Sequence, residues 1–328
     1  MIGDHELNNL EEIPKEWLYF NTFNLRKKGI NYPYTQKQID EILHCAIDKK
    51  YFIKNYVYIT TDGKVEKFNI YPYQETICDN ISNNRFNILK MPRQSGKTTT
   101  TAANALHELL FTPNWRVGIV ANKAMIAMMI IDIMQDMILN LPFWLQQGVE
   151  IWNKGKIQFE NGSRAISEAT SPRALRGQSI SHLIWDEVAF VESNIASQFL
   201  SSIQPTIAAS LTSKITLSST PVGYNHFAKL WFDAINKVND FIPMEIQWHD
   251  VPGRDEHYKS TIIKNFGIEH WNQEYESVGG DTIIHVRHIK TGLIEKLTME
   301  MLYSRLKYWY PERLNDINKS WEEQNEKM

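Results

Sequence analysis

From residue 70 onward, short runs of apolar residues alternate with longer segments in which apolar side chains recur every three or four positions. The short runs predict buried strands, and the longer spacing predicts amphipathic helices. The predicted strands are residues 86–89, 116–120, 157–159, 182–185 and 214–217, and the predicted helices are residues 98–110 and 123–139. Such alternation predicts an α/β fold with a mostly parallel sheet and helices on both faces.

The first 70 residues have a less regular pattern. Residues 35–47 have helical spacing, whereas the aromatic run at residues 51–60 favours a β-strand. A turn signal follows at Thr61-Asp62-Gly63-Lys64. We therefore predict a separate N-terminal subdomain of helices and strands over residues 1–70, followed by the α/β domain over residues 71–276.

Composition indicates a chain that buries a core, because 43% of its 328 residues are hydrophobic and 12% aromatic. The net charge of −3 excludes a global basic field, so any contact with nucleic acid must come from local patches. Cys45 and Cys78 lack the spacing of a zinc site or a disulfide framework and suit a reducing cytoplasm. The apolar stretch at residues 124–131 is too short to span a bilayer, so no membrane partner is expected.

A phosphate-binding loop follows the strand predicted at residues 86–89. Its general pattern is G-x-x-x-x-G-K-[ST] between a strand and a helix, and here it reads Met91-Pro92-Arg93-Gln94-Ser95-Gly96-Lys97-Thr98, with Met91 in place of the first glycine. Gly96 lets the backbone approach phosphate, Lys97 neutralises the β and γ oxygens, and Thr98 can ligate Mg²⁺. The helix that begins near Thr98 directs free N–H groups at the anion.

Arg93 places a second cation in this loop. Beside the γ-phosphate it can stabilise transition-state charge, as an arginine finger supplied in cis does. The alternative is an arginine that is solvated on the loop.

Two carboxylates, Asp186 and Glu187, end the apolar run at residues 182–185. In a P-loop enzyme the first holds the Mg²⁺ shell and the second orients and polarises the attacking water. The additional glutamate favours hydrolysis over transfer to a second substrate, because a kinase does not need an activated water. The loop and the acidic pair together predict a P-loop NTPase of the RecA/ASCE-like type.

Three further motifs leave more than one interpretation open. Ser218-Ser219-Thr220-Pro221 ends a strand and either senses the loss of the γ-phosphate or forms a plain loop. Gln74 can satisfy both hydrogen-bonding edges of an adenine, although the glutamine alone is a weak signal. Arg173 and Arg176 can contact phosphate of nucleotide or DNA, or remain solvated.

The order of these motifs resembles the large terminase subunit of tailed bacteriophages, with the myovirus type most similar. The resemblance covers about residues 30–276 and rests on several motifs in the same order. They are Tyr-Pro-Tyr-Gln at 71–74, Pro-Arg-Gln-Ser-Gly-Lys-Thr at 92–98, Ala-Leu-Arg-Gly at 174–177, Trp-Asp-Glu at 185–187, Ser-Ser-Thr-Pro at 218–221, Gly-Tyr-Asn-His-Phe at 223–227, and the later segments 248–255 and 271–276.

The resemblance implies an ATP-hydrolysing, Mg²⁺-dependent motor that translocates double-stranded DNA into a prohead. It implies a portal protein and a small terminase subunit as partners, and the cytoplasm of the infected host cell as location. Its catalytic residues are Glu187 and the cis arginine Arg93, its metal ligands Thr98 and Asp186, and its coupling residues Ser218, Ser219 and Thr220. The implied ATP-binding residues are Gln74, Arg93, Gln94, Ser95, Gly96, Lys97, Thr98 and Thr99.

Beyond Glu276 the sequence departs from that family, in which a few residues and an RNase H-like nuclease domain follow. Residues 277–328, a short β-rich appendage by pattern, resemble the first block of an intein, with Ser277 and then Gly-Asp-Thr at 280–282. Ser277 would attack the carbonyl of Glu276 to give an ester, the first step of splicing. Other splicing blocks are missing, which implies a trans-splicing partner: a C-terminal split-intein chain that carries the nuclease. The alternative is an unusual linker or a truncated nuclease start.

Two rival functions remain. A helicase-like remodelling ATPase would need a second RecA-like domain, for which residues 277–328 are too few. An inert extein precursor would only deliver residues 1–276 to a splicing partner.

Overall fold

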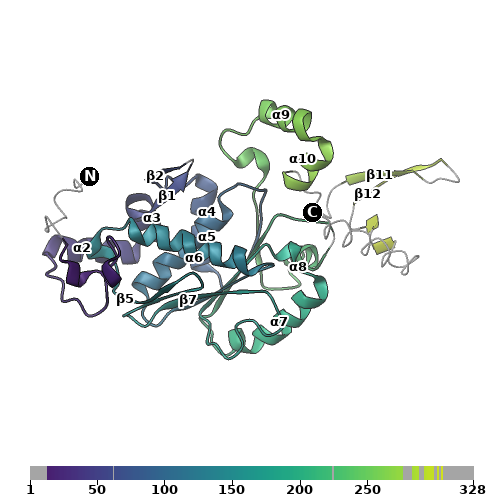
Figure 1. Ribbon diagram of the computed structural model, residues 1–328. Coiled ribbons are helices and arrows are strands. Elements are labelled where there is room, and N and C mark those ends of the chain that lie inside the picture. Colours follow the sequence, from purple (N-terminus) through teal and green to yellow (C-terminus); the bar gives the residue numbers. More distant parts are fainter. Residues whose placement is uncertain are drawn as a thin grey trace.

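The centre of the molecule is a twisted eight-stranded sheet in the order β10-β3-β9-β8-β4-β7-β6-β5 (Figure 1). The computed structural model describes residues 13–61, 63–223, 225–275, 283–287, 292–298, 301–302 and 304–305. The strands from β10 to β7 are parallel, and β6 and β5 continue the sheet antiparallel. The strands are β3 (Phe86–Lys90), β4 (Arg116–Ala121), β5 (Val149–Asn153), β6 (Lys156–Phe159), β7 (Arg164–Ala169), β8 (His182–Asp186), β9 (Lys214–Ser219) and β10 (Ile242–Glu245).

Helices cover both faces of this sheet, which confirms the predicted α/β fold (Figure 1). One face carries α4 (Pro72–Asn83), α5 (Lys97–Phe111) and α6 (Ala124–Leu139), and the other carries α7 (Ser193–Ala208) and α8 (His226–Ile235). Strand β8 is buried throughout: Ile184 packs with α5 and α6, whereas Leu183 and Trp185 pack with α7 and α8. Burial on both faces is the reason that the strand sequences are continuously apolar.

The predicted strands and helices of the α/β part are all present, with ends within a few residues of the predicted ones. The short 3-10 turns η3 (Phe143–Leu145) and η4 (Val188–Phe190) link neighbouring elements. The apolar stretch at residues 124–131 forms the first half of α6. None of the helices in the described part of the chain is both long and apolar enough to cross a membrane.

The N-terminal part contains η1 (Lys15–Trp17), η2 (Tyr19–Asn21), α2 (Gln36–Ile47), α3 (Lys49–Tyr56) and the hairpin of β1 (Tyr58–Thr61) with β2 (Lys64–Lys67). Helix α2 confirms the prediction at residues 35–47, with Thr35 and Gln38 forming a reciprocal capping box. The strand predicted at residues 51–60 is wrong over its first half, which is α3. Asp48 caps that helix by accepting the Tyr51 N–H, and the buried face follows helical spacing despite its aromatic composition.

The first 70 residues share a hydrophobic core with the α/β part. Cys45 of α2 and Phe52 of α3 belong to the same buried cluster as Leu106 of α5 and Ile131 of α6. The domain boundary at residue 70 therefore stays a prediction. The shared core does not by itself support it.

After β10 the chain forms η5 (Trp248–Asp250), α9 (Glu256–Phe266) and α10 (Ile268–Glu274). Beyond α10, the structure describes an antiparallel hairpin of β11 (Ile283–Arg287) and β12 (Ile294–Thr298). Ser277, the predicted splicing nucleophile, and the Gly-Asp-Thr run at 280–282 lie outside the described residues.

Candidate functional site

The phosphate loop connects the end of β3 to the start of α5, at the edge where the parallel strands have their carboxyl ends. Gly96, the residue before the helix, has φ +72°, and a Cβ there would collide with the Gln74 amide. Gly96 is thus required for its backbone conformation, and a larger residue would also displace the end of the Gln74 side chain. Met91, at the position where the general pattern has glycine, buries its side chain with Leu89 and Ile246 in a small apolar cluster, which explains its presence.

The backbone of this loop is arranged as an anion cradle. Arg254 donates from Nη2 to the carbonyl oxygens of Arg93 and Gln94, at 2.9 Å each. In a trans peptide the C=O and the following N–H point in opposite directions, so the N–H groups of Gln94 and Ser95 point away from Arg254. Within the described part of the chain, neither N–H donates to another group. Together with the N-terminus of α5 they form a site suited to phosphate.

Lys97 joins the loop to the acidic pair. Its Nζ lies 3.2 Å from Asp186 Oδ1 and 2.9 Å from Glu187 Oε1, in a buried position. Burial opposes the charged ammonium, but the two carboxylates outweigh that effect and raise the pKa of Lys97. Sequence motifs 90 residues apart therefore meet as one charged cluster.

Asp186 is the hub of this cluster. It accepts hydrogen bonds from Thr98 Oγ1 at 3.0 Å, from Ser218 Oγ at 2.7 Å and from the Glu187 N–H at 3.0 Å. A carboxylate and hydroxyl oxygens are the ligand type that Mg²⁺ prefers, so the donor set fits this ion. In the described residues no group of three or more His, Cys, Asp and Glu is placed to hold a metal, so phosphate oxygens and water would have to complete the shell.

Glu187 differs from its neighbour in both backbone and environment. Its φ is +53°, an uncommon conformation for a residue other than glycine. Its Oε2 is buried and has no hydrogen-bond partner in the part of the chain that the structure describes. Burial raises the pKa of Glu187; Lys97 opposes this effect and Asp186 reinforces it. A buried carboxylate oxygen without a partner can accept a hydrogen bond from water.

The end of β9 links the acidic pair to the phosphate loop. Ser218 donates to Asp186, as above, while Ser219 Oγ accepts the Ala189 N–H at 3.0 Å and the Ser219 carbonyl accepts the Met91 N–H at 3.1 Å. Thr220 Oγ1 is buried without a partner among the described residues. The predicted coupling residues thus contact both the strand end that bears Asp186 and the start of the phosphate loop.

Arg93 does not lie against the acidic pair in this structure. Its Nε lies 2.6 Å from Glu274 Oε2, its own N–H donates to the Glu274 carbonyl at 3.1 Å, and its side chain is 55% exposed. Its charge still acts on Glu187, where it is the last of the causes that oppose the rise of the pKa produced by burial. The sequence singled out neither Glu274 nor Arg254, although both lie in segments that carry the family resemblance.

Gln74 lies beside the phosphate loop near the start of α4. Its Oε1 accepts the Tyr71 N–H at 2.9 Å and its amide group faces Gly96. Its carbonyl oxygen is therefore already used in capping α4, and the adenine contact stays a prediction. Thr99 lies in the first turn of α5.

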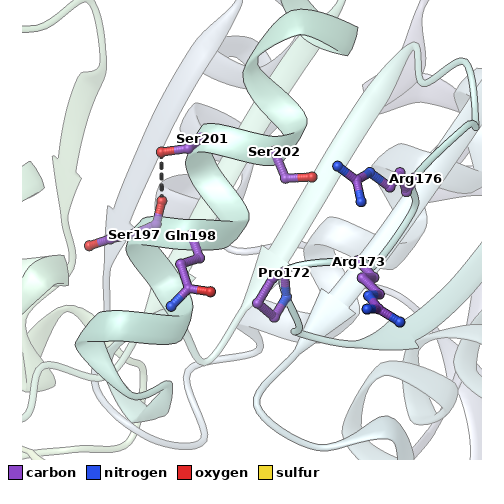
Figure 2. Close-up of a pocket in the computed structure, with 7 residues that line it drawn as sticks. All are labelled: Pro172, Arg173, Arg176, Ser197, Gln198, Ser201 and Ser202. Carbon is purple, nitrogen blue, oxygen red and sulfur yellow. Dashed lines mark hydrogen bonds between the residues drawn. The ribbon is translucent and has the colours of Figure 1, made fainter.

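Arg173 and Arg176 line a different feature, an open groove of 520 Å³ between the turn after β7 and helix α7. Figure 2 shows the two guanidinium groups beside the turn and the polar side chains of α7 across from them. The α7 residues that line the groove are Ser197, Gln198, Ser201 and Ser202. The groove includes no residue of the phosphate loop or of the acidic pair, so the two arginines are not brought together with Lys97 here.

Comparisons with known proteins match this architecture. A family model described as "Terminase large subunit, T4likevirus-type, N-terminal" matches residues 88–284. The large terminase of bacteriophage HK97 has a TM-score of 0.59 at 15% identity, covering 80% of this chain and 70% of that one. The large terminase ATPase domain of Thermus phage P74-26 has a TM-score of 0.52 at 20% identity, covering 64% of this chain and 93% of that one. At these identities the structural likeness shows the fold alone.

Proposed function

This chain belongs to the T4-like phage terminase large subunits, whose N-terminal domain matches residues 88–284, and we propose that it binds and hydrolyses ATP at Lys97, Asp186 and Glu187. The observation that carries the proposal is the convergence of the phosphate loop and the acidic pair on one buried cluster. The large terminase of bacteriophage D6E has been solved in complex with ADP, which supports a nucleotide as ligand. The hydrolysis would drive double-stranded DNA into a prohead.

Each residue of the cluster has a task in this proposal. The N–H groups of the loop and the Lys97 ammonium bind the phosphates. Thr98 and Asp186 would hold Mg²⁺, which would supply charge neutralisation when bound. Glu187, through its unpartnered Oε2, orients the attacking water and accepts its proton. Arg93 neutralises charge that develops on the γ-phosphate, for which it must leave Glu274. When the γ-phosphate is lost, the contacts of Ser218, Ser219 and Thr220 transmit the resulting movement to neighbouring structure.

Steady-state hydrolysis of MgATP tests this function. We expect hydrolysis by the wild-type chain, complete loss on chelation of the metal with EDTA, and a decrease of about 10²- to 10³-fold in Lys97→Ala, because the variant lacks the cation that binds the phosphates. Lys64→Ala, in the exposed strand β2, is the matched control and should retain wild-type turnover. Equal rates in wild-type and Lys97→Ala protein would refute the assigned site.

Family resemblance further supports the partners proposed for the motor: DNA, a portal protein and a small terminase subunit, in the cytoplasm of the infected cell. We also propose that residues 277–328 are the N-terminal fragment of a split intein, preceded by the ATPase domain at 71–276 and an N-terminal subdomain at 1–70. The proposal rests on Ser277 and the Gly-Asp-Thr run of the sequence, and the β11–β12 hairpin is compatible with it.

The splicing proposal is tested by mixing the chain with a candidate C-terminal intein chain and weighing the products. We expect a spliced product in which residues 1–276 are joined to the partner's extein and residues 277–328 are lost. Ser277→Ala should prevent it, because the variant has no nucleophile for the first ester. A product of the Ser277→Ala variant with the same mass would show that Ser277 is not the nucleophile.

A further inference from the structure

Residues 248–275, here called the clamp segment, contact the phosphate loop mainly through polar groups. The segment comprises η5, α9 and α10 and extends from the body of the molecule (Figure 1). None of the residues of α9 is buried, and Val251 attaches the segment to the small apolar cluster that contains Met91. Its buried tryptophans, Trp248 and Trp271, pack against each other within the segment, so its polar contacts with the phosphate loop can decide its position.

Two side chains of the clamp segment hold the loop. Glu274 pairs with the Arg93 guanidinium at 2.6 Å and accepts the Arg93 N–H through its carbonyl. Arg254 donates to the carbonyls of Arg93 and Gln94. Both contacts fall on the residues that precede Lys97, so the clamp segment touches the site next to the position that the γ-phosphate would occupy.

The pair between Arg93 and Glu274 is unequal. The Arg93 side chain is 55% exposed, whereas the Glu274 side chain is only 9% exposed. An exposed arginine can turn to another anion at little cost, but a buried carboxylate that loses its partner is strongly destabilised. Exposure of the Glu274 carboxylate to water would remove this cost when Arg93 leaves, and that exposure requires a shift of α10.

A shift of α10 would carry the rest of the clamp segment with it. Trp271 packs edge-on against Trp248 at 5.1 Å and stacks on Tyr275 at 4.7 Å between ring centroids. The Arg254 guanidinium lies over the rings of Tyr258 and Tyr275, at 5.6 and 5.3 Å. Because these rings connect η5, α9 and α10, the segment has the contacts of one packed unit.

We propose that Glu274 is a positioning residue that competes with the γ-phosphate of ATP for Arg93, so that ATP, but not ADP, releases the clamp segment from the phosphate loop. The proposal rests on the proposed ATPase function. Arg254 has a separate effect: by holding the two loop carbonyls it fixes the N–H cradle as long as the clamp segment is in place, that is, without nucleotide and with ADP bound. The end of α10 leads into residue 276, so the release would pass the nucleotide state to whatever follows in the chain.

The affinities of MgADP and Mg-ATPγS, measured by calorimetry for wild-type and variant chains, separate the two effects. In Glu274→Gln, Arg93 no longer has to leave a carboxylate, so ATPγS should bind about 5- to 150-fold more tightly while the ADP affinity is unchanged. Arg254→Lys should weaken MgADP binding more than Mg-ATPγS binding, because the Arg254 contacts with the loop persist only while the clamp segment is in place. Glu256→Gln, at the exposed start of α9, is the matched control and should change neither affinity.

Hydrogen exchange of residues 256–275 provides the second readout. We expect Mg-ATPγS, but not MgADP, to accelerate exchange in this segment of the wild-type chain, and Glu274→Gln to show the fast exchange without nucleotide. Suppose that the wild-type chain binds both nucleotides. If Glu274→Gln then alters the two affinities equally, or if hydrogen exchange does not respond to ATPγS, the proposed role of Glu274 is wrong but the proposed ATPase function is unaffected. If the wild-type chain binds neither nucleotide, both the proposed ATPase function and the proposed role of Glu274 are wrong.

Discussion

Asp186 and Glu187 are consecutive carboxylates whose surroundings assign them different chemistry. Asp186 accepts three hydrogen bonds, which fix its oxygens beside Thr98 and Ser218. Glu187 has a positive φ and keeps one buried oxygen without a partner among the described residues. Pairs of titratable groups with unlike environments are typical of acid–base sites.

The pH dependence of hydrolysis should report Glu187. Burial raises its pKa, so the ionised form that accepts a proton from water is lost at a higher pH than for an ordinary glutamate. The acid limb of kcat/KM, which reports groups of the free enzyme, should therefore lie above the ordinary glutamate value of about 4.3. A limb at or below that value in a pH–rate profile would argue against Glu187 as the base.

At the scale of elements, the sequence predicted where the parallel strands end. This was possible because strands that are buried on both faces are continuously apolar, so that each run stops where the strand stops. The strand predicted over the residues of α3 is wrong because the prediction relied on their aromatic composition, whereas their helical spacing decides the structure. Glu274 and Arg254 could not be placed at the site from sequence, since Arg254 lies 161 residues beyond Arg93 and only the tertiary fold brings them together. The motifs predicted which residues meet at Asp186, but not that Arg93 pairs elsewhere.

The buried Glu108 connects helix α5 to the amino-terminal ends of strands β8 and β9, opposite the strand ends that carry the phosphate loop and the acidic pair. Its carboxylate contacts His182 Nδ1 at 2.7 Å and lies 3.7 Å from the Lys49 ammonium and 3.8 Å from that of Lys214. Burial opposes the ionised form, but His182 and the lysines outweigh it and hold the pKa of Glu108 well below its usual range. The group therefore contributes stability above the unfolded pKa and loses it as the pH falls through the folded pKa.

Glu108→Gln should lower the free energy of unfolding by about 3 kcal/mol at neutral pH, because it leaves buried cations without their carboxylate. Urea titration measures the change. The variant should also lose less stability than the wild type as the pH falls below about 4, since the titrating group is gone. Glu66→Gln on the exposed strand β2 is the control and should change the free energy by less than about 0.5 kcal/mol. A loss as small as the control's would contradict a structural role for Glu108.

For the whole molecule, the shared core implies that the N-terminal 70 residues and the α/β part unfold together. Phe52 is fully buried in the cluster that also contains residues of α5 and α6. A subdomain that shares its core with its neighbour has no independent hydrophobic centre, so a single cooperative transition is expected.

Phe52→Ala should reduce the free energy of unfolding by about 3 to 5 kcal/mol, the cost of a large cavity, and shift one thermal transition as a whole. Differential scanning calorimetry resolves the transitions. Phe23→Ala serves as the control, because that side chain is 85% exposed. A separate early transition in Phe52→Ala, with the remainder melting as in the wild type, would show instead that the N-terminal part is an independent domain.

In the proposed function, Glu187 activates water for the hydrolysis of an ATP held by the phosphate loop. Glu187→Gln keeps the shape of the side chain but cannot accept a proton. In a single-turnover experiment the variant should bind MgATP with near wild-type affinity and hydrolyse it about 10²- to 10⁴-fold more slowly, while Glu192→Gln, exposed at the start of α7, behaves as wild type. Wild-type turnover by Glu187→Gln would contradict the claim.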